Sequence, residues 1–571
     1  MNRFLLFVVT VTIIATAATA AVAQDQQDNE NSLLPEIDPQ DIEIRSQFKA
    51  QFPGLRRQPI LGFDPTPRVY QIDPNRMPFM ETEEQVVADL PVSELSRPDP
   101  PAYTPPHYSD DINLFSRLGF GSYATPEAQL WGVSRISEKS YVGGDLDFSS
   151  SDGHLDNQQS SFRFLDASAQ YVTKLSSESR VEVDGGIRNS FNNMFDLPTQ
   201  TMIPDAARKE YSGFNLGADF QQFKNTITGW KAQANIRYYD TDLNNAGMLS
   251  GTSEERVYNA SLAKRWAGSN VNETFTVKAG AKGGNYSNNG APSDRWVTAQ
   301  AGVAYERLFN YETKVTADVS AYYADDQFSS TIHPGLSVEA KHPVMENLTI
   351  SVEAGAEPTV KTIEQLHKQN RFLNVDNTLR HSYRINGRAE ASLSYTDLGK
   401  ANIGFTYENI SDQPIFVRES QTPNIGSANP LFYETRYADI YRVKAYASVT
   451  QQVITDKFRV NAKVYLQSPQ VQDGGRIPFE EKVGATAGLT IRPFDVVTFE
   501  AWTDYVGSRQ TGQTNETLDG FFLLGGQADV QITERFGAYL KGVNLLNQDY
   551  QVWQGYTERP FQLYGGITVK L

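Results

Sequence analysis

Six histidines are the residues of this 571-residue chain best suited to acid–base chemistry or metal binding. They are spread along the sequence, at His107, His154, His333, His342, His367 and His381. A typical zinc site places two ligands about three to five residues apart, as in the helical string His-Glu-x-x-His. No such pair occurs here, so the spacing of the histidines predicts no metal site.

His154 directly follows Asp152 and Gly153 in a segment that we predict to be an external loop. A histidine near an aspartate or serine at the rim of an outer-membrane protein could act as a general base. A lone histidine in a loop is far more often an ordinary surface residue. We therefore predict no catalytic residue, and we do not expect an enzyme.

Asp240 and Asp242 precede Asn244 and Asn245, and together they offer the hard oxygen ligands that Ca²⁺ prefers. The cluster lacks the spaced glutamate of a defined calcium loop, so a solvated turn is the simpler interpretation. No glycine-rich phosphate-binding loop is present either. The sequence predicts no cofactor and no metal.

Composition excludes several further classes. The chain has no cysteine, which rules out a disulfide framework, a thiolate metal site, a cysteine nucleophile and a lipoprotein anchor. Its net charge of −17 argues against a nucleic-acid partner, because a phosphate backbone selects basic proteins.

The first residues have the pattern of an export signal. Arg3 precedes an apolar run from Phe4 to Ile14, and the small residues Ala21-Val22-Ala23 form a signal-peptidase site before Gln24. We predict a signal peptide at residues 1–23; the alternative is an uncleaved N-terminal anchor helix. No second apolar run of about 18 residues follows, so the sequence offers no further transmembrane helix.

From about Asn113 to the end, apolar and polar residues alternate in long segments. Such alternation gives a strand one apolar and one polar face. In the last segment one face carries Phe561, Leu563, Gly565, Ile567, Val569 and Leu571, and the other carries Gln562, Tyr564, Gly566, Thr568 and Lys570. The same pattern occurs at Phe458–Gln467 and at Lys314–Tyr323.

A soluble β-sandwich would also alternate, but three features favour a transmembrane barrel. The segments span about 10–17 residues, whereas soluble strands average about 5–6. Their apolar faces carry Ala, Val and Gly with aromatics near the ends, as a lipid face with aromatic girdles does. Short turns also alternate with long polar loops, as in outer-membrane barrels. We predict short turns near Glu138, Ser177, Asn225, Ser269, Tyr311, Glu346, Gly399, Asp456, Asp495 and Glu534, and long loops such as Asn192–Ala206, Thr359–Asn377 and Ser411–Tyr433.

These turns predict an all-β fold, a transmembrane antiparallel barrel of about 22 strands at residues 111–571, with both termini in the periplasm. Weak alternation at Leu118–Ile136 leaves 20 strands as the alternative. Charged residues on the predicted lumen face need no special role, because barrel interiors are polar. They include Lys231, Arg237, Lys278, Lys282, Arg459 and Lys463.

Residues 24–110 differ from the barrel because they hold half of the 28 prolines. Proline fixes φ and removes a hydrogen-bond donor, so we expect an extended, irregular periplasmic segment. It could be a plain linker. Alternatively, its apolar cluster between Phe48 and Ile72 could be ordered against the barrel lumen or against a partner.

The string Gly542-Val543-Asn544-Leu545-Leu546-Asn547-Gln548-Asp549-Tyr550, followed by Trp553 and Gly555-Tyr556, resembles the closing hairpin of TonB-dependent receptors. The resemblance covers about residues 112–571, with motif support in the last 30 or so. It implies import of siderophores, vitamins, sugars or peptides, driven through an energy-coupled envelope partner, with a plug domain of about 130 residues filling the barrel.

This chain departs from that pattern in front of the barrel. About 87 proline-rich residues are too few for such a plug, so the chain resembles a relative without one. The best candidate for an energy-coupling string is Asp41-Ile42-Glu43-Ile44, which is also an ordinary extended sequence. The chain ends in Leu571 where many outer-membrane proteins end in an aromatic residue.

Together these observations predict an integral protein of the outer membrane, in contact with its lipid, that binds or transports a solute. Residues 24–110 would contact a TonB-type or other envelope protein. The main alternative is a barrel without a plug that acts as a scaffold or anchor subunit of an envelope complex. An outer-membrane enzyme is the third interpretation.

Overall fold

The computed structural model describes residues 113–571 except for 156–159, 195–206, 225–227, 245–250, 270–271, 311, 397, 419–432 and 513–515. Predictions for the signal peptide, for the segment 24–110 with its apolar cluster, and for Asp41–Ile44 lie outside the described residues.

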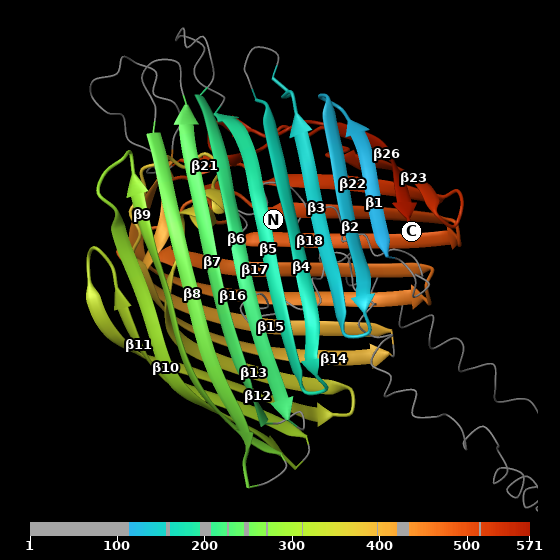
Figure 1. Cartoon of the computed structure of the whole chain (residues 1–571). Helices are drawn as coiled ribbons and strands as arrows, with labels where there is room; N and C mark the ends of the chain where they lie inside the picture. The colour runs from blue at the N-terminus through green and yellow to red at the C-terminus, as the bar shows by residue number, and fades with distance from the viewer. Residues whose placement is uncertain are drawn as a thin grey trace, which may run out of the picture. The chain divides into compact units, whose positions relative to one another are not determined.

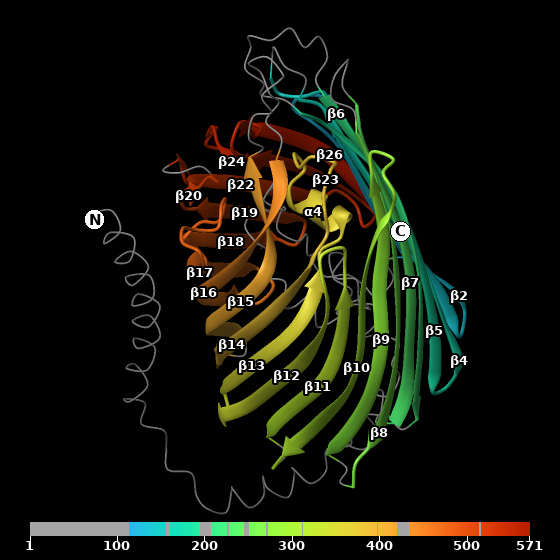
Figure 2. The same cartoon turned by 90° about the vertical axis from the view of Figure 1, so that its left-hand side faces the viewer.

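Twenty-two antiparallel strands of the described residues form one sheet, and the first strand pairs with the last, so that the sheet closes into a barrel (Figures 1 and 2). In order they are β1 Leu114–Gly121, β2 Thr125–Ser137, β3 Ser140–Ser151, β4 Phe162–Ser176, β5 Ser179–Met194, β6 Ala207–Lys224, β7 Thr228–Asn244, β8 Gly251–Ala267, β9 Glu273–Asn288, β10 Asp294–Phe309, β11 Thr313–Asp325, β12 Ser330–Met345, β13 Leu348–Val360, β14 His381–Thr396, β15 Gly399–Arg418, β16 Tyr433–Ile454, β17 Phe458–Val471, β18 Val483–Phe494, β19 Val497–Val506, β22 Phe521–Gln531, β23 Phe536–Val543 and β26 Gln562–Lys570.

Three small elements interrupt the connections at the rim opposite the short turns. They are the helix α4 Ile363–Gln369, the hairpin β20 Arg509–Gln510 with β21 Thr517–Leu518, and the hairpin β24 Gln551–Trp553 with β25 Tyr556–Thr557. Among the described residues, no helix is both long and apolar enough to cross a membrane.

The predicted fold class and strand number are confirmed, and so are the short turns that the structure describes; the turn residues Asn225 and Tyr311 lie outside the described residues. The weakly alternating stretch near Leu118 forms the strand pair β1 and β2, joined by the tight turn Ser122–Ala124. All three long loops were predicted to start too early: Asn192 lies inside β5 and Thr359 inside β13. The largest difference is at Ser411, which lies inside β15; this strand continues to Arg418 through a β-bulge between Ile410 and Gln413. The bulge places Asp412 at φ 52° and interrupts the alternation of polar and apolar residues. In the sequence, such an interruption looks like the start of a loop.

The two faces of the wall strands are those that the alternation predicts. In β26, Leu563 and Ile567 are 43% and 51% exposed on the outside, whereas Gln562 and Lys570 are buried on the inside. Val464 of β17 is likewise exposed, next to the buried Tyr465. Since the outward side chains of this closed barrel are apolar, their environment is lipid, and the protein is placed in the outer membrane.

The structure of the closing hairpin shows why its sequence contains two asparagines. Asn544 and Asn547 adopt φ values of 51° and 50°, a left-handed conformation that Asn tolerates better than most residues. The Gln548 N–H donates to Asn544 Oδ1 over 2.9 Å, and the Phe561 N–H donates to Asn547 Oδ1 over 2.9 Å. The two leucines between the asparagines are exposed on the outside.

The two ends of the barrel meet at the rim that carries the short turns. Phe115 pairs with Lys570 and Gly121 with Tyr564, and the Asn113 and Leu114 N–H groups both donate to the Leu571 carbonyl. Both ends therefore lie on the side that outer-membrane barrels turn to the periplasm. The opposite rim, with the long connections, is the outer rim.

Candidate functional site

The connection between β13 and β14 does not extend away from the outer rim but folds into the lumen. We call residues 361–380 the inner loop; they include α4, which Figure 2 shows inside the ring of strands. A barrel of about 22 strands is wide enough that its lumen must be filled to stay closed. The inner loop supplies part of that filling.

The sequence of the inner loop favours a short helix at this place. Thr362 is the N-cap, and its side chain accepts from the Gln365 N–H. The Thr362 N–H in turn donates to the side-chain oxygen of Gln365, which completes a capping box. Glu364 lies in the first turn and Lys368 in the last, where their charges suit the helix dipole.

Charged side chains of the wall hold the inner loop across the lumen. Glu364 forms ion pairs with Arg188 of β5 and Arg237 of β7. The Ile363 N–H donates to Glu255 Oε2 of β8 over 2.7 Å, and Lys209 of β6 donates to the Leu373 carbonyl. Burial alone would raise the pKa of Glu364, but the neighbouring cations lower it, so the helix is held by a carboxylate.

His367 is fully enclosed between α4 and the wall. The Tyr239 hydroxyl lies 3.1 Å from its Nδ1, and its Nε2 lies 3.3 Å from the Asn374 carbonyl, so Nε2 carries the proton. Burial, reinforced by the charge of Lys209, holds the pKa of His367 well below its usual range. His367 is therefore a neutral structural residue of the closure.

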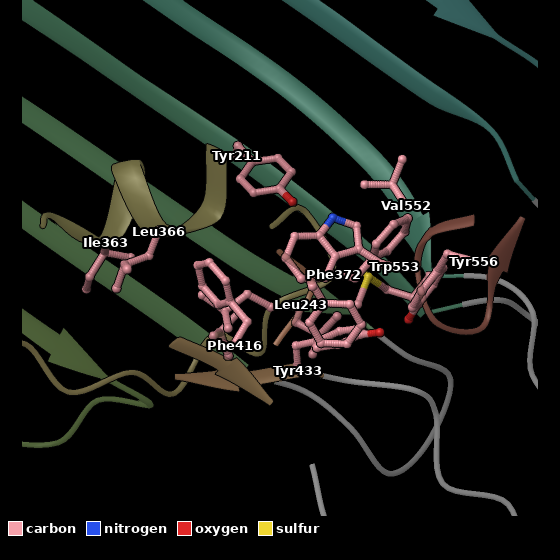
Figure 3. Packing of buried hydrophobic residues seen from close by; sticks show 14 of the residues in the cluster. Tyr211, Leu243, Ile363, Leu366, Phe372, Phe416, Tyr433, Val552, Trp553 and Tyr556 are labelled. Atoms are coloured by element: carbon pink, nitrogen blue, oxygen red, sulfur yellow. The ribbon is translucent and has the colours of Figure 1, made fainter. Parts of the chain in front are cut away.

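An apolar core joins the inner loop to the other long connections (Figure 3). Phe372 stacks on Tyr556 of β25 with ring centroids 3.4 Å apart, and Trp553 of β24 packs between Tyr433 and Phe479. Ile363, Leu366, Phe372 and Leu373 have no exposed surface. The outer end of the lumen is thus closed by a packed protein core rather than by loose loops.

Glu481 lies beside this core, in the connection Gln472–Lys482, outside the strands. It accepts from the Tyr465 hydroxyl over 2.6 Å and is completely buried, and burial raises its pKa to about 7. The neighbouring Glu480 raises the pKa of Glu481 further, and Arg509 opposes the shift. Burial also lowers the pKa of Arg509 to about 10.

We expect the connection Gln472–Lys482 to open more readily as the pH rises. Between about pH 4.5 and 7 the packed state retains a proton on Glu481 that the opened state releases, so the free energy of opening falls as pH increases and is lowest above pH 7. Hydrogen exchange at the Ile477 and Phe479 amides, corrected for intrinsic rates, should accelerate by up to about tenfold per pH unit in this window. Glu481→Gln should abolish the pH dependence, and an unchanged dependence in that variant would contradict the assignment.

A cavity of about 230 Å³ lies in the lumen next to this closure, against β1–β4 and β26. Its aromatic lining consists of Phe148, Phe164, Trp502, Tyr550 and Tyr564, and its charged lining of Arg117, Glu127, Asp147, Asp166, Lys541, Glu558 and Arg559. The Lys541 ammonium donates to Glu127 over 2.7 Å. Convergent polar groups among aromatic rings are typical of sites for small molecules.

An ion pair connects the lining of the cavity with the inner loop. Glu558, which lines the cavity, accepts from the guanidinium of Arg371 in the inner loop over 2.7 Å. Both side chains are largely buried, so the pair is poorly screened by solvent. A molecule that bound in the cavity would lie beside one of the bonds that hold the inner loop.

His154, the histidine considered for catalysis, has a structural role. It lies near the outer rim, with Nε2 3.0 Å from the Thr557 carbonyl and Nδ1 3.4 Å from Ser160 Oγ. Because its Nε2 bonds a backbone carbonyl, the ring is occupied in holding the hairpin of β24 and β25. Burial lowers the pKa of His154.

The acidic cluster considered for calcium does not form a loop. Asp240, Asp242 and Asn244 lie within β7, and Asn245 lies outside the described residues. Asp240 and Asp242 fall on the same face, opposite the buried Tyr239 and Thr241. Within the described ranges, no group of three or more His, Asp or Glu side chains is arranged around a common metal position.

Several of the predicted lumen charges make contacts inside the barrel. Arg237 reaches Glu364 of the inner loop, Lys278 pairs with Asp318 over 2.7 Å, and Lys282 lies 5.9 Å from the ring of the buried Trp296. Lys463 lies 5.6 Å from the Tyr446 ring. Of these, Arg237 belongs to the closure; the others neutralise or cover the wall.

Solved structures with a similar architecture are distant in sequence. The copper transporter OprC superimposes with a TM-score of 0.64 at 12% identity, over 80% of each chain. The FrpB iron transporter from Neisseria meningitidis gives 0.63 at 9% identity, over 81% of each chain. The ferripyoverdine receptor of the outer membrane of Pseudomonas aeruginosa gives 0.63 at 10% identity, over 82% of this chain and 72% of that one.

The chain has the barrel fold of TonB-dependent receptors. The resemblance that the closing hairpin carries is thereby confirmed at the level of the fold. At these identities the likeness to receptor barrels extends to the fold alone. The sequence matches no family model and no curated protein.

Sequence reasoning did not identify the residues that close this receptor-type barrel. A usable signal was present: Ile363, Leu366, Phe372 and Leu373 are apolar residues inside a connection between strands, and an exposed loop does not need them. In the sequence, Trp553 and Tyr556 carry the family resemblance alone. Their role as packing partners of the inner loop became visible only in the structure.

Proposed function

We propose that this protein binds a solute at the cell surface and admits it across the outer membrane, with the inner loop as the gate. The observation that carries the proposal is the Arg371–Glu558 pair, because it connects the solute cavity with the closure. A ligand that interacts with Glu558 competes with a contact of the gate. Binding and opening are then coupled through one side chain.

The lining suggests the class of solute. Carboxylates and cations occur together with aromatic rings, so a small molecule with both hydrogen-bonding or charged groups and a planar or apolar part fits best. The similar barrels include proteins named as transporters of copper and of iron and a receptor for ferripyoverdine, which supports transport as the class of function. Their cargoes are not transferred to this chain.

A partner in the envelope is the second part of the proposal. We propose that residues 24–110 contact a TonB-type or other envelope protein, as the sequence predicts, since both ends of the barrel lie at the rim of short turns.

A cavity-filling variant tests the proposed site while the solute is still unidentified. Ser149 lines the cavity, whereas its neighbour Ser150 lies on the opposite face of β3, so Ser149→Phe fills the cavity and Ser150→Phe is the matched control. After incubation with spent culture medium, native mass spectrometry should show a bound small molecule on the original protein and on Ser150→Phe, but not on Ser149→Phe. Equal adducts on all three proteins, or none on any, would contradict binding in this cavity.

A second function is favoured by the packing of the closure. The inner loop is buried as completely as a protein core, which suits a barrel that stays shut and anchors an envelope complex. Purification from native membranes distinguishes the two. Stoichiometric envelope proteins with no solute adduct would favour the scaffold, and a solute adduct without such proteins would favour the receptor.

A further inference from the structure

Two histidines that are 48 positions apart in the sequence meet near the outer rim, at a distance from the solute cavity. Nε2 of His333, in β12, lies 3.3 Å from Nε2 of His381, the first residue of β14. His381 Nδ1 lies 2.6 Å from Asp326 Oδ2, in the connection between β11 and β12. The three side chains form a chain of carboxylate, imidazole and imidazole.

Backbone hydrogen bonds hold the Asp326 carboxylate in position. Asp326 Oδ2 also accepts from the His381 N–H over 2.8 Å, and its Oδ1 accepts from the Phe328 and Ser329 N–H groups. The side chains of His381 and Asp326 are 8% and 1% exposed. Because Asp326 accepts the Nδ1 proton, the Nε2 lone pair of His381 is directed at His333.

The second imidazole is also held. The His333 ring stacks on Tyr383 with centroids 4.7 Å apart and an interplanar angle of 17°, and the Tyr383 hydroxyl donates to the Pro334 carbonyl over 2.8 Å. His333 itself is only half-buried, so the pair is accessible from solvent.

We propose that His333 and His381 bind a divalent late transition-metal ion, such as Zn²⁺ or Cu²⁺, through their Nε2 atoms. Zinc–imidazole bonds of about 2.0–2.1 Å at a tetrahedral angle separate the two nitrogens by about 3.3–3.4 Å, which is the distance observed. Imidazole is a preferred ligand of these ions. A carboxylate on the second nitrogen of a ligating histidine fixes its tautomer and raises its basicity, and Asp326 occupies that place.

The site would leave coordination positions open. Within the described part of the chain no third His, Asp or Glu completes it, so water or a donor group of a ligand would fill the remaining positions. The position of the site would also let a bound metal connect two parts of the fold. β12 pairs with β13 only from Leu336 onward, so its first residues pair with β11 alone. Because His381 directly follows the inner loop, the metal would join this end of β12 to the base of that loop.

Zinc titration of the full-length protein in detergent, without an affinity tag, tests the proposal. We expect one site that is lost in His333→Ala and in His381→Ala. Asp326→Asn keeps both ligands and should weaken binding by about 10–100-fold. His342→Ala is the matched control, because His342 lies on the same strand near the opposite rim, bonded to Thr313.

A Cu²⁺-loaded sample gives an independent readout, since its electron paramagnetic resonance spectrum should show coupling to two nitrogens in the original protein and in His342→Ala. Heat-modifiable migration in gels confirms that each variant is a folded barrel. If the original protein binds no more Zn²⁺ than the double variant at His333 and His381, the two rings are only a hydrogen-bonded pair and the proposal is wrong. The same holds if His333→Ala retains the affinity of the original protein.

Discussion

Replacing residues 362–379 with a short Gly-Ser link should turn a closed barrel into a conducting one. The inner loop supplies α4 and the buried residues Phe372 and Leu373, which fill the outer lumen together with β24 and β25. Without them a wide polar lumen is left, since barrels of this strand number are otherwise plugged. Planar-bilayer recordings should change from no openings to discrete conductance steps, and cells should become sensitive to large antibiotics.

The control for this deletion is a shortening of the β9–β10 connection at Asn289–Pro292. The tip of this connection is open, because nothing lies within 4 Å of the position where Gly290 would carry a side chain. The shortening keeps Asn288, whose side chain donates to Asp376 and Asn377 of the inner loop. This shortening of the β9–β10 connection should leave the conductance unchanged. A barrel that folds without the inner loop and still does not conduct would contradict the closure by this loop alone.

A folded barrel that does not conduct after loss of the inner loop would indicate that residues 24–110 also close the lumen. Deleting residues 24–105 as well then tests the sequence hypothesis that part of residues 40–80 is ordered against the barrel or a partner. Conductance that appears only in the double deletion would show that both segments close the lumen. Conductance with the inner-loop deletion alone would leave the segment as a linker or as a docking arm.

The second large effect concerns the lipid face. Val464 is 43% exposed on the outside of β17, and a lysine near the midplane of the lipid face costs roughly 2–4 kcal/mol, so Val464→Lys should impair assembly. Asn461 lies on the other face of the same strand, beside Gly488, and Asn461→Lys should assemble normally. Urea titration of both variants in lipid vesicles measures the difference. Equal stability would mean that the register of β17 is wrong.

The wall of the barrel was predictable because one physical rule governs every strand. Each residue between the two membrane surfaces must face either lipid or the lumen, so Val315–Tyr323 and Phe561–Leu571 show their faces directly in the sequence. The short turns were predictable for the same reason, since polar residues interrupt the alternation there. Beyond the lipid the rule no longer applies, and there the prediction for Ser411 failed.

The closure and the histidine pair could not be predicted in the same way. Phe372 and Tyr556 are brought together by the folding of two different connections, and His333 and His381 by the positions of β12 and β14. No periodicity relates such residues. A single sequence shows that Ile363 and Leu366 are too apolar for an exposed loop, but it does not show what covers them.

The way in which the inner loop is attached determines the direction from which it can be opened. Its ends continue into neighbouring strands, β13 at Val360 and β14 at His381, and both anchors lie at the outer rim. A pull from the periplasm would draw the loop against its own tethers. An outward swing needs the release of side-chain contacts such as Arg371–Glu558 and of the backbone hydrogen bonds that join Phe372 and Asn374 to Tyr433. We therefore expect the work of opening to be done by ligand binding on the outside of the cell, up to the difference in affinity between the closed and open states. A gate attached in this way is opened by a ligand that binds from outside the cell.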